Sequence, residues 1–155
     1  MSYVQPMTPF SAPTQSYLSQ AGWYVGRKVS TIKYRAYLAG EGYAWFPKVA
    51  AFLEEFGDLL VQFERQSGHL DTLNLDACDA SAGFDGQWVQ HDYARRLHRA
   101  SFCVIGQAYS DHLLLFMDEE GNVYGGFDDY LCFIADSGHQ AIEAICTNQP
   151  LREIP

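Results

Sequence analysis

The stretch VAAFLEEFGDLLVQF, residues 49–63, joins a helical pattern to a strand pattern at a single glycine. Its first half places four apolar side chains at the spacing of one helix face: Val49, Phe52, Leu53 and Phe56. Its second half alternates, so that Leu59, Val61 and Phe63 share one side of a strand. The stretch therefore predicts a helix that is followed directly by a strand with one buried face.

Gly57, at the corner between the two patterns, is interpreted as a structural residue. Nucleotide-binding turns run from a strand through glycines to a helix, because phosphate then meets the free N–H groups at the helix N-terminus. Here the glycine follows the helix. We expect Gly57 at the C′ position in a left-handed conformation, which would cost a non-glycine residue about 1–2 kcal/mol. The corner thus predicts a bend and no phosphate site.

The segments on either side of this corner predict the remaining elements. We expect three helices before Gly57: one capped by Thr14 and ending before Gly22, one capped by Ser30 and reaching Gly40 or Gly42, and one starting near Pro47. Alternating apolar residues and turn residues predict strands over 59–64, 69–75, 102–109, 112–117, 122–126 and 130–135. Helical spacing predicts two further helices: one over 87–100 with the stripe Val89, Tyr93, Leu97 and Ala100, and one opening at Ser137, with Gln140 at capping-box spacing.

This order of elements is typical of an α+β domain with a mostly antiparallel sheet. A chain of 155 residues is about one domain long. We expect an irregular N-terminal arm over residues 1–13 and a tail over residues 151–155. Between them, over residues 14–150, we expect a single domain in which the N-terminal helices pack on the sheet and a C-terminal helix closes it.

The charge is distributed unevenly along the chain. Residues 1–50 carry one acidic and five basic side chains, whereas the remainder carries 18 acidic and five basic ones, a balance of −13 within a net charge of −9. Such a field repels nucleic acid and anionic membranes, so we expect neither as a partner. It would speed the encounter with a basic protein, although acidity can also serve solubility alone.

Motifs and composition weigh against several kinds of site. The sequence contains no GxSxG, GxxxxGK[ST], GxGxxG or HExxH motif, which argues against the familiar hydrolases and nucleotide enzymes. Four widely spaced cysteines, expected to be buried small hydrophobes, form no zinc or redox motif: Cys78, Cys103, Cys132 and Cys146. The chain shows neither an apolar run of about 18 residues nor a signal-peptide pattern, so we expect a cytoplasmic protein.

Two local patterns suggest metal sites but do not match them. In MDEEGNVY, residues 117–124, Gly121 is fourth from Asp118, whereas an EF-hand loop needs glycine at its sixth position. This segment is therefore predicted to be a hairpin turn. His91 and His98 lie seven residues apart, which separates them by about 10 Å along a helix and prevents them from sharing one metal. We expect no metal and no cofactor.

Four segments of the chain, taken in order, resemble the successive motifs of a known family. They are LSQAGWYVGR (18–27), AAFLEEFGDLLV (50–61), VIGQAYSDHLLLFMDEEGNVYGGFDDYL (104–131) and SGHQAIEAI (137–145). Together they resemble the SUKH superfamily, and within it the third SUKH immunity-protein family, over about residues 17–147. The matching positions are architectural ones, such as Trp23, Arg27 and Gly57. Where the family often has a second glycine and a helix-ending glycine, this chain has Asp58 and His98.

The resemblance implies a SUKH-like fold and a role as a bacterial immunity protein. Such proteins are encoded beside polymorphic or contact-dependent toxins, as in toxin–antitoxin pairs, and bind the catalytic domain of the toxin without being enzymes. The acidic balance suits a basic toxin, for instance a nuclease. Five acids that crowd a predicted hairpin and its exit are the candidate partner-binding residues: Asp118, Glu119, Glu120, Asp128 and Asp129. Tyr24, Tyr43 and Trp45 are candidate aromatic anchors.

Two alternatives stay open at this point. A regulatory or ligand-binding module on the same scaffold would show a concave apolar pocket and binding that depends little on salt. An enzyme that uses a cysteine or a histidine would show one of these groups with a perturbed pKa in a cleft. The oligomeric state is left open.

Overall fold

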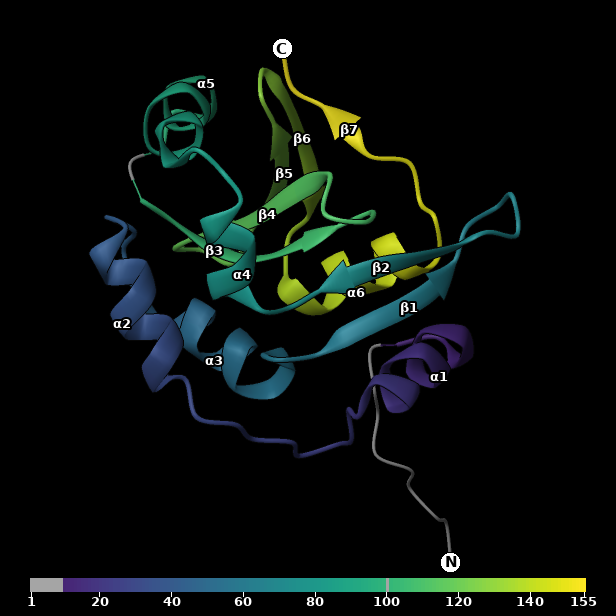
Figure 1. The fold of residues 1–155 in the computed structure, drawn as a ribbon. Helices are drawn as coiled ribbons and strands as arrows, with labels where there is room; N and C mark the ends of the chain where they lie inside the picture. Colours follow the sequence, from purple (N-terminus) through teal and green to yellow (C-terminus); the bar gives the residue numbers. More distant parts are fainter. Residues whose placement is uncertain (1–9, 100) are drawn as a thin grey trace, which may run out of the picture.

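The computed structural model describes residues 10–99 and 101–155, which form one seven-stranded antiparallel sheet and the helices around it (Figure 1). The strands follow one another in the sheet in chain order: β1 (Leu60–Glu64), β2 (Leu70–Asn74), β3 (Phe102–Ala108), β4 (Leu113–Asp118), β5 (Val123–Phe127), β6 (Tyr130–Ala135) and β7 (Arg152–Glu153). The helices are α1 (Ala12–Ala21), α2 (Ile32–Gly40), α3 (Pro47–Phe56), α4 (Ala77–Ala82), the π-helix η1 (Trp88–Tyr93), α5 (Ala94–Leu97) and α6 (Gly138–Cys146). The predicted α+β class with an antiparallel sheet is confirmed.

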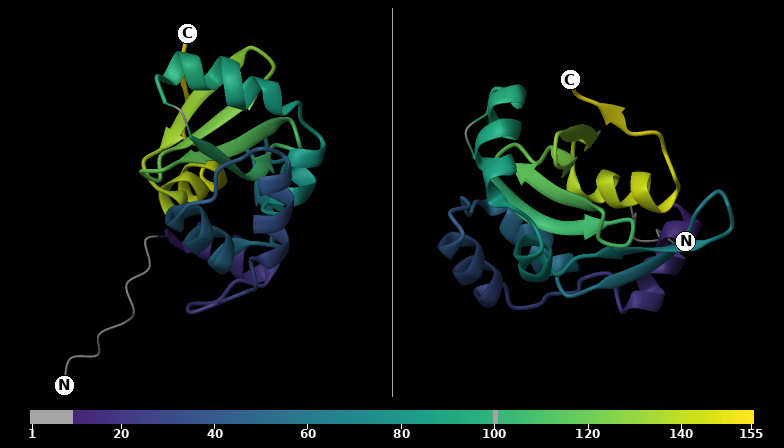
Figure 2. Two further views of the ribbon diagram at one scale, coloured as in Figure 1. Left: turned by 90° about the vertical axis from the view of Figure 1, so that its left-hand side faces the viewer. Right: turned by 45° about the horizontal axis from the view of Figure 1, so that its top comes forward.

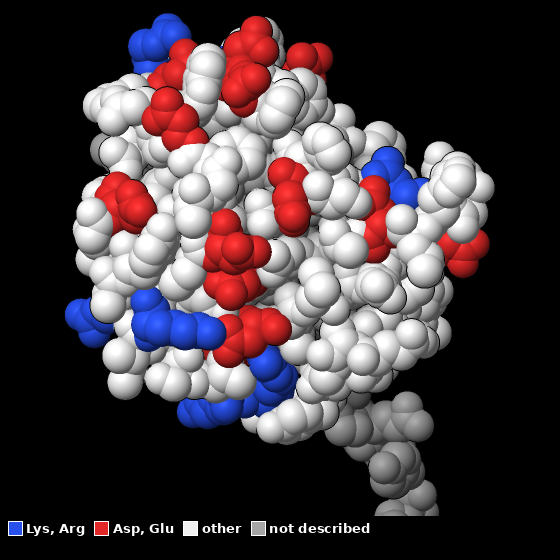
Figure 3. All heavy atoms as spheres, in the orientation of Figure 1, with Lys and Arg blue, Asp and Glu red and all other residues white. Residues whose placement is uncertain are grey.

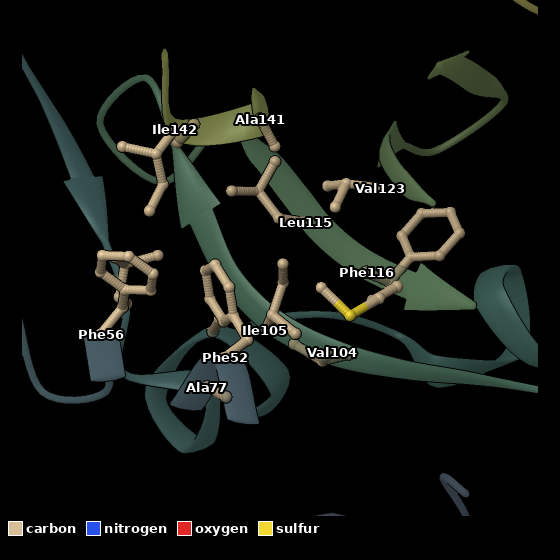
Figure 4. Close-up of a cluster of buried hydrophobic side chains, with 14 of the residues drawn as sticks. Phe52, Phe56, Ala77, Val104, Ile105, Leu115, Phe116, Val123, Ala141 and Ile142 are labelled. Carbon is tan, nitrogen blue, oxygen red and sulfur yellow. The ribbon is translucent and has the colours of Figure 1, made fainter. Parts of the chain in front are cut away.

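Helices cover both faces of the central strands, as the left view of Figure 2 shows for η1 and α5 on one side and α6 on the other. On one face, Phe52 of α3 and Ile142 of α6 meet Leu115 of β4 in the cluster drawn in Figure 4. On the other face, the Tyr93 ring of η1 stacks on Phe116, with ring centroids 5.5 Å apart. Because both faces are covered, every residue of β3 and β4 is buried, which explains their nearly continuous apolar sequence.

The helix–strand corner has the predicted elements but a different backbone from the one expected. Helix α3 begins at Pro47 and β1 alternates between exposed and buried residues, both as predicted. Gly57, however, has φ −54°, and it is Asp58 that adopts the left-handed conformation with φ 71°. The expectation of a left-handed Gly57 is therefore wrong.

A close approach explains why glycine occupies position 57. A Cβ atom there would lie 2.9 Å from Tyr34 Cε2 and closer still to the Leu53 carbonyl oxygen. The segment before α2 also holds the corner, since Arg27 donates hydrogen bonds to the carbonyl oxygens of Glu55 and Gly57, the latter at 2.9 Å. Gly57 is thus required for packing and not for a positive φ.

The N-termini of the first two helices also differ from the prediction. Helix α1 begins after Ser11, and Thr14 is buried inside it, where its hydroxyl donates to Glu143 Oε2 at 2.8 Å. The N-cap of α2 is Thr31 and not Ser30. The capping predicted for the last helix is confirmed, because Gln140 N donates to Ser137 Oγ at 3.1 Å.

Residues on both sides of the predicted 14–150 domain pack against it. Phe10 is buried, with its ring centroid 5.6 Å from that of Trp23, and β7 adds a strand beside β6 after residue 150. Residues 1–9 of the predicted arm lie outside the described part of the chain. The domain boundaries therefore stay a prediction.

The connection between β2 and β3 contains one element that the sequence patterns missed and one that they predicted. Helix α4 was not predicted, although Asp76 caps it by accepting a hydrogen bond from Asp79 N at 3.1 Å. The predicted helix over 87–100 is observed as η1 followed by α5, with Ala100 outside the described residues. It ends at His98, which has the left-handed φ of 54°. Glycine adopts this conformation readily, which fits the glycine that the resembled family often has at this position.

Candidate partner-binding surface

The sheet topology divides the five predicted acidic residues into two separate groups. Asp118, Glu119 and Glu120 lie at the β4–β5 turn, whereas Asp128 and Asp129 form the β5–β6 turn. Strand β5 runs between these turns, so the two groups lie at opposite ends of a five-residue strand, about 16 Å apart along it. The structure therefore does not bring the five carboxylates together.

Asp118 is occupied within the fold and presents no surface to a partner. Its side chain is 1% exposed and lies 3.2 Å from Arg99 Nε. It also accepts hydrogen bonds from the backbone N–H groups of Glu120 and Asn122 and from the Tyr124 hydroxyl, each at 3.0 Å. The predicted hairpin turn is confirmed, and the Asp118 carboxylate shapes it.

The two other acids of this turn are exposed. Glu120 pairs with Arg99, with Oε1 2.9 Å from Nη1, and two-thirds of its side chain remains accessible. Glu119 is also exposed. A surface pair of this kind contributes little to stability. The carboxylates of both Glu119 and Glu120 are therefore accessible to a binding partner.

Side chains of η1 and α5 hold the backbone of the β5–β6 turn in place. The Tyr93 hydroxyl donates to the Asp128 carbonyl oxygen, and Arg96 Nη1 donates to the Asp129 carbonyl oxygen at 2.8 Å. Both acids are exposed, and the neighbouring Phe127 is 48% exposed. The turn therefore presents one aromatic side chain and two carboxylates on a backbone that is held in place.

The absence of a side chain at Gly126 allows this turn to be held. A Cβ atom there would lie 2.7 Å from Tyr93 Cζ, so glycine lets the Tyr93 ring lie directly on β5 and reach the turn. Gly125 instead makes room for Leu113, whose Cδ2 would lie 2.7 Å from a Cβ atom at that position. Sequence reasoning identified the acids but missed Phe127 and the contacts of Tyr93 and Arg96, because those contacts join segments more than 30 residues apart.

Of the three candidate aromatic anchors, Tyr24 alone is largely exposed, at 61%. Tyr43 is 6% exposed, and burial raises its pKa to about 12, which fits a core residue. Trp45 is half-buried and packs against the core. Tyr24 thus remains the one anchor candidate of the three that a partner can reach directly.

The surface charge follows the division seen in the sequence. In Figure 3, acidic side chains spread over the upper and central part of the face, where α4, α5 and the β5–β6 turn lie. Most basic side chains on this face gather at the lower left and bottom, around α2, with others at the upper left and at the right. Several of these basic groups are already paired, including Lys28 with Glu54 and Lys33 with Asp58. Each pair removes one charge of either sign, so the excess of 19 acidic over 10 basic side chains remains.

A hollow of about 370 Å³ lies between α3, the β4–β5 turn and the start of α6. Phe52 and Met117 contribute apolar surface, whereas Lys48, Asp136 and His139 bring charged or polar groups to its wall. Its lining is mostly apolar with a few polar groups, which is the composition that the alternative of a ligand-binding module predicts.

The thiols and the metal-binding residue types form no reactive cluster in the part of the chain that the structure describes. Burial raises the pKa of Cys103 to about 12, of Cys132 to about 11 and of Cys146 to about 12, so these groups stay protonated at neutral pH. Cys78 is half-buried. Within residues 10–99 and 101–155, no three His, Cys, Asp or Glu side chains lie together as metal ligands, and no helix is long and apolar enough to cross a membrane.

Ion pairs around the surface predict a loss of stability in acid. Burial alone would raise the pKa of Asp71, but hydrogen bonds from Ser110, Thr72 N and Arg65 outweigh it, and the pKa lies below its ordinary value of 3.8. Hydrogen bonds from Arg96 and Arg95, each 2.9 Å from the carboxylate, likewise lower the pKa of Asp92. A lowered folded-state pKa contributes stability above the unfolded pKa that is lost as the pH falls through the folded value.

We therefore expect the free energy of unfolding to fall between about pH 5 and the folded-state pKa values. Urea denaturation at a series of pH values, followed by tryptophan fluorescence, measures this dependence. Asp71→Asn should be less stable at neutral pH and should show a shallower acid loss. Equal pH dependence in both proteins would contradict the assignment.

The class of protein follows from a comparison with known families, with which the fold agrees. It is a small α+β domain whose exposed features are acidic turns, and its buried thiols are protonated. Residues 10–148 match the sequence profile of the family described as SUKH-3 immunity protein, and the chain belongs to that family. Membership supports an immunity role in general and implies binding of a cognate toxin. No curated protein and no solved structure matches the chain.

Proposed function

We propose that this protein neutralises a bacterial toxin by binding its catalytic domain, without catalysing a reaction itself. The family match over residues 10–148 carries the proposal. In this proposal the protein acts in the cytoplasm of the producing cell, against a polymorphic or contact-dependent toxin. The balance of −13 over residues 51–155 favours a basic toxin, such as a nuclease whose cleft attracts phosphate.

We place the principal contact at the β5–β6 turn. Asp128 and Asp129 are exposed there, Phe127 lies beside them, and Tyr93 and Arg96 fix the turn. Glu119 and Glu120 form a second acidic contact at the other end of β5, and Asp118 supports it by holding the β4–β5 turn. Preorganised charges of this kind mainly accelerate association.

The partner is identified by immobilising the protein, passing lysate of the source bacterium over it and eluting with rising salt. One basic toxin domain is expected in the eluate by mass spectrometry. Co-expression of that domain with this protein should restore growth of cells that the domain alone kills. Recovery of no toxin domain, or continued killing in the presence of this protein, would overturn the proposed function.

Two charge-matched variants locate the face. Asp128→Asn with Asp129→Lys, and Glu119→Lys with Glu120→Gln, each change the net charge by +3, and asparagine tolerates the left-handed backbone of residue 128. We expect the first pair of substitutions to slow association with the toxin domain by about tenfold or more at low salt, and the second pair to slow it less. Surface plasmon resonance at several salt concentrations measures both rates. The reverse order would move the principal contact to the β4–β5 turn.

A further inference from the structure

The hollow of about 370 Å³ between α3, the β4–β5 turn and the start of α6 is not used by the contacts proposed above. We call it the α3–α6 hollow. Its volume lies within the roughly 300–1,000 Å³ of ligand-binding pockets. Four apolar side chains contribute to its wall: Pro47, Ala51, Phe52 and Met117. Phe52 belongs to the buried cluster in Figure 4, so part of this wall is fixed by the core.

Two glycines let the walls of the α3–α6 hollow come together. A Cβ atom at Gly138 would contact the Phe52 ring and would lie 3.3 Å from Met117 Cε. A Cβ atom at Gly121 would lie 2.9 Å from Lys48 Cδ and 3.6 Å from Lys48 Nζ. Glycine at position 138 therefore lets Phe52 pack against the start of α6. Glycine at position 121 lets the Lys48 side chain lie along the β4–β5 turn, at the wall of the hollow.

Two polar residues of this wall already have partners within the fold. His139 Nε2 lies 3.1 Å from Glu55 Oε1, and Trp23 Nε1 donates a hydrogen bond to Glu55 Oε2 at 3.0 Å. Both carboxylate oxygens of Glu55 are therefore occupied. We expect Glu55 and His139 to shape the hollow without binding what enters it.

Lys48 and Asp136 are the two charged residues of the wall that stay unpaired. Both are exposed, and neither forms an ion pair or a side-chain hydrogen bond with any residue that the structure describes. A ligand with charge of one sign only would meet one of these groups as a like charge, which is unfavourable. A zwitterion complements both groups, and its apolar part complements the rest of the wall.

We propose that the α3–α6 hollow binds a free α-amino acid with an apolar side chain. The carboxylate of the ligand pairs with Lys48, and its ammonium group pairs with Asp136. Hydrogen bonds between charged groups are stronger than neutral ones, and the apolar side chain adds the free energy of burial against Ala51 and Phe52. Within a protein chain the same two groups are joined in peptide bonds and carry no charge. The site therefore selects a small molecule and does not depend on the proposed function.

The first test uses the full chain and four ligands. L-Phenylalanine carries both charges and an apolar side chain, 2-phenylethylamine lacks the carboxylate, 3-phenylpropanoate lacks the ammonium group, and glycine lacks the side chain. L-Phenylalanine should shift the amide signals of Ala51, Gly121 and Gly138 of ¹⁵N-labelled protein saturably, with a Kd of about 1 mM or below. Each of the other three should bind at least about tenfold more weakly. Absence of saturable shifts, or equal affinity for L-phenylalanine and a singly charged analogue, overturns the inference.

Charge variants test the two pairings separately. Lys48→Gln should weaken the binding of L-phenylalanine but not of 2-phenylethylamine, which has no carboxylate to pair. Asp136→Asn should weaken the binding of L-phenylalanine but not of 3-phenylpropanoate, which has no ammonium group. Arg35→Gln and Asp111→Asn remove exposed charges of the same signs outside the wall, and each Kd should then change by less than about threefold. An equal loss for L-phenylalanine and the matching analogue overturns the pairing.

A larger side chain in the wall tests the place of binding. Ala51→Trp fills the hollow without changing its charge and should abolish the shifts of Gly121 and Gly138. Ala36→Trp, at an exposed position of α2 outside the wall, should retain them. Unchanged binding of L-phenylalanine to the Ala51→Trp protein overturns the inference. No measurement in this series uses the toxin, so its failure leaves the proposed function intact, and the failure of the proposed function leaves this inference intact.

Discussion

Replacing Asp118 by alanine is expected to lower the free energy of unfolding by about 3 kcal/mol. The substitution removes one acceptor from two backbone N–H groups, from the buried Tyr124 hydroxyl and from Arg99. Water cannot easily replace an acceptor whose side chain is 1% exposed, and unsatisfied buried donors are costly. Urea denaturation, monitored by circular dichroism, measures the change.

Glu119→Ala is the matched control for Asp118→Ala. It removes a carboxylate from the next residue of the chain, but Glu119 is exposed, so stability should change by less than about 0.5 kcal/mol. Asp118→Asn should fall between the two, because its amide oxygen keeps part of the acceptor function. Equal stability of the Asp118→Ala and Glu119→Ala proteins would show that the Asp118 network does not hold the β4–β5 turn.

Gly57→Val is expected to be at least as damaging, at about 3 kcal/mol or more. Its side chain would enter the space of Tyr34 Cε2 and the Leu53 carbonyl oxygen. The backbone cannot move away easily, because Arg27 binds the Gly57 carbonyl oxygen at 2.9 Å and Tyr34 donates a hydrogen bond to Asp58. The melting temperature, measured by differential scanning calorimetry, should fall by more than about 10 °C.

Gly40→Val provides the comparison for Gly57→Val. Gly40 ends α2, and no atom lies within 4 Å of a Cβ built there. We expect a change of less than about 1 kcal/mol at this position. An unchanged melting temperature for Gly57→Val would contradict the close packing at the corner.

The sequence predicted the elements of the fold better than the reasons for particular residues. Alternation and helical spacing identified α3, β1 and the strands from β3 to β6, because each of these depends on which side of a local element is buried. At Gly57 the element was right and the mechanism was wrong. The closest contact is with the local Leu53 carbonyl oxygen, but the second comes from the Tyr34 ring, which lies more than 20 residues away in the chain. Local periodicity carries no information about such distant contacts.

The candidate surface shows the same limit. Composition identified acidic turns, but it could not show that Asp118 points inward while Asp128 and Asp129 point outward. That difference depends on Arg99 and Tyr124 meeting at the β4–β5 turn, and on Tyr93 and Arg96 reaching the β5–β6 turn. Helix α4 was missed because six residues are too few to establish a helical period.

The contacts that fix the β5–β6 turn involve only main-chain oxygen atoms of residues 128 and 129. The side chains at these positions can therefore be exchanged during evolution while the turn keeps its shape. Because only its main-chain oxygen is bound, residue 129 can be replaced by almost any other residue. Residue 128 has a left-handed φ of 50°, which favours Asp, Asn or Gly. Under the proposed function, a few substitutions at this one turn would therefore change the toxin specificity of a related chain without passing through unstable intermediates.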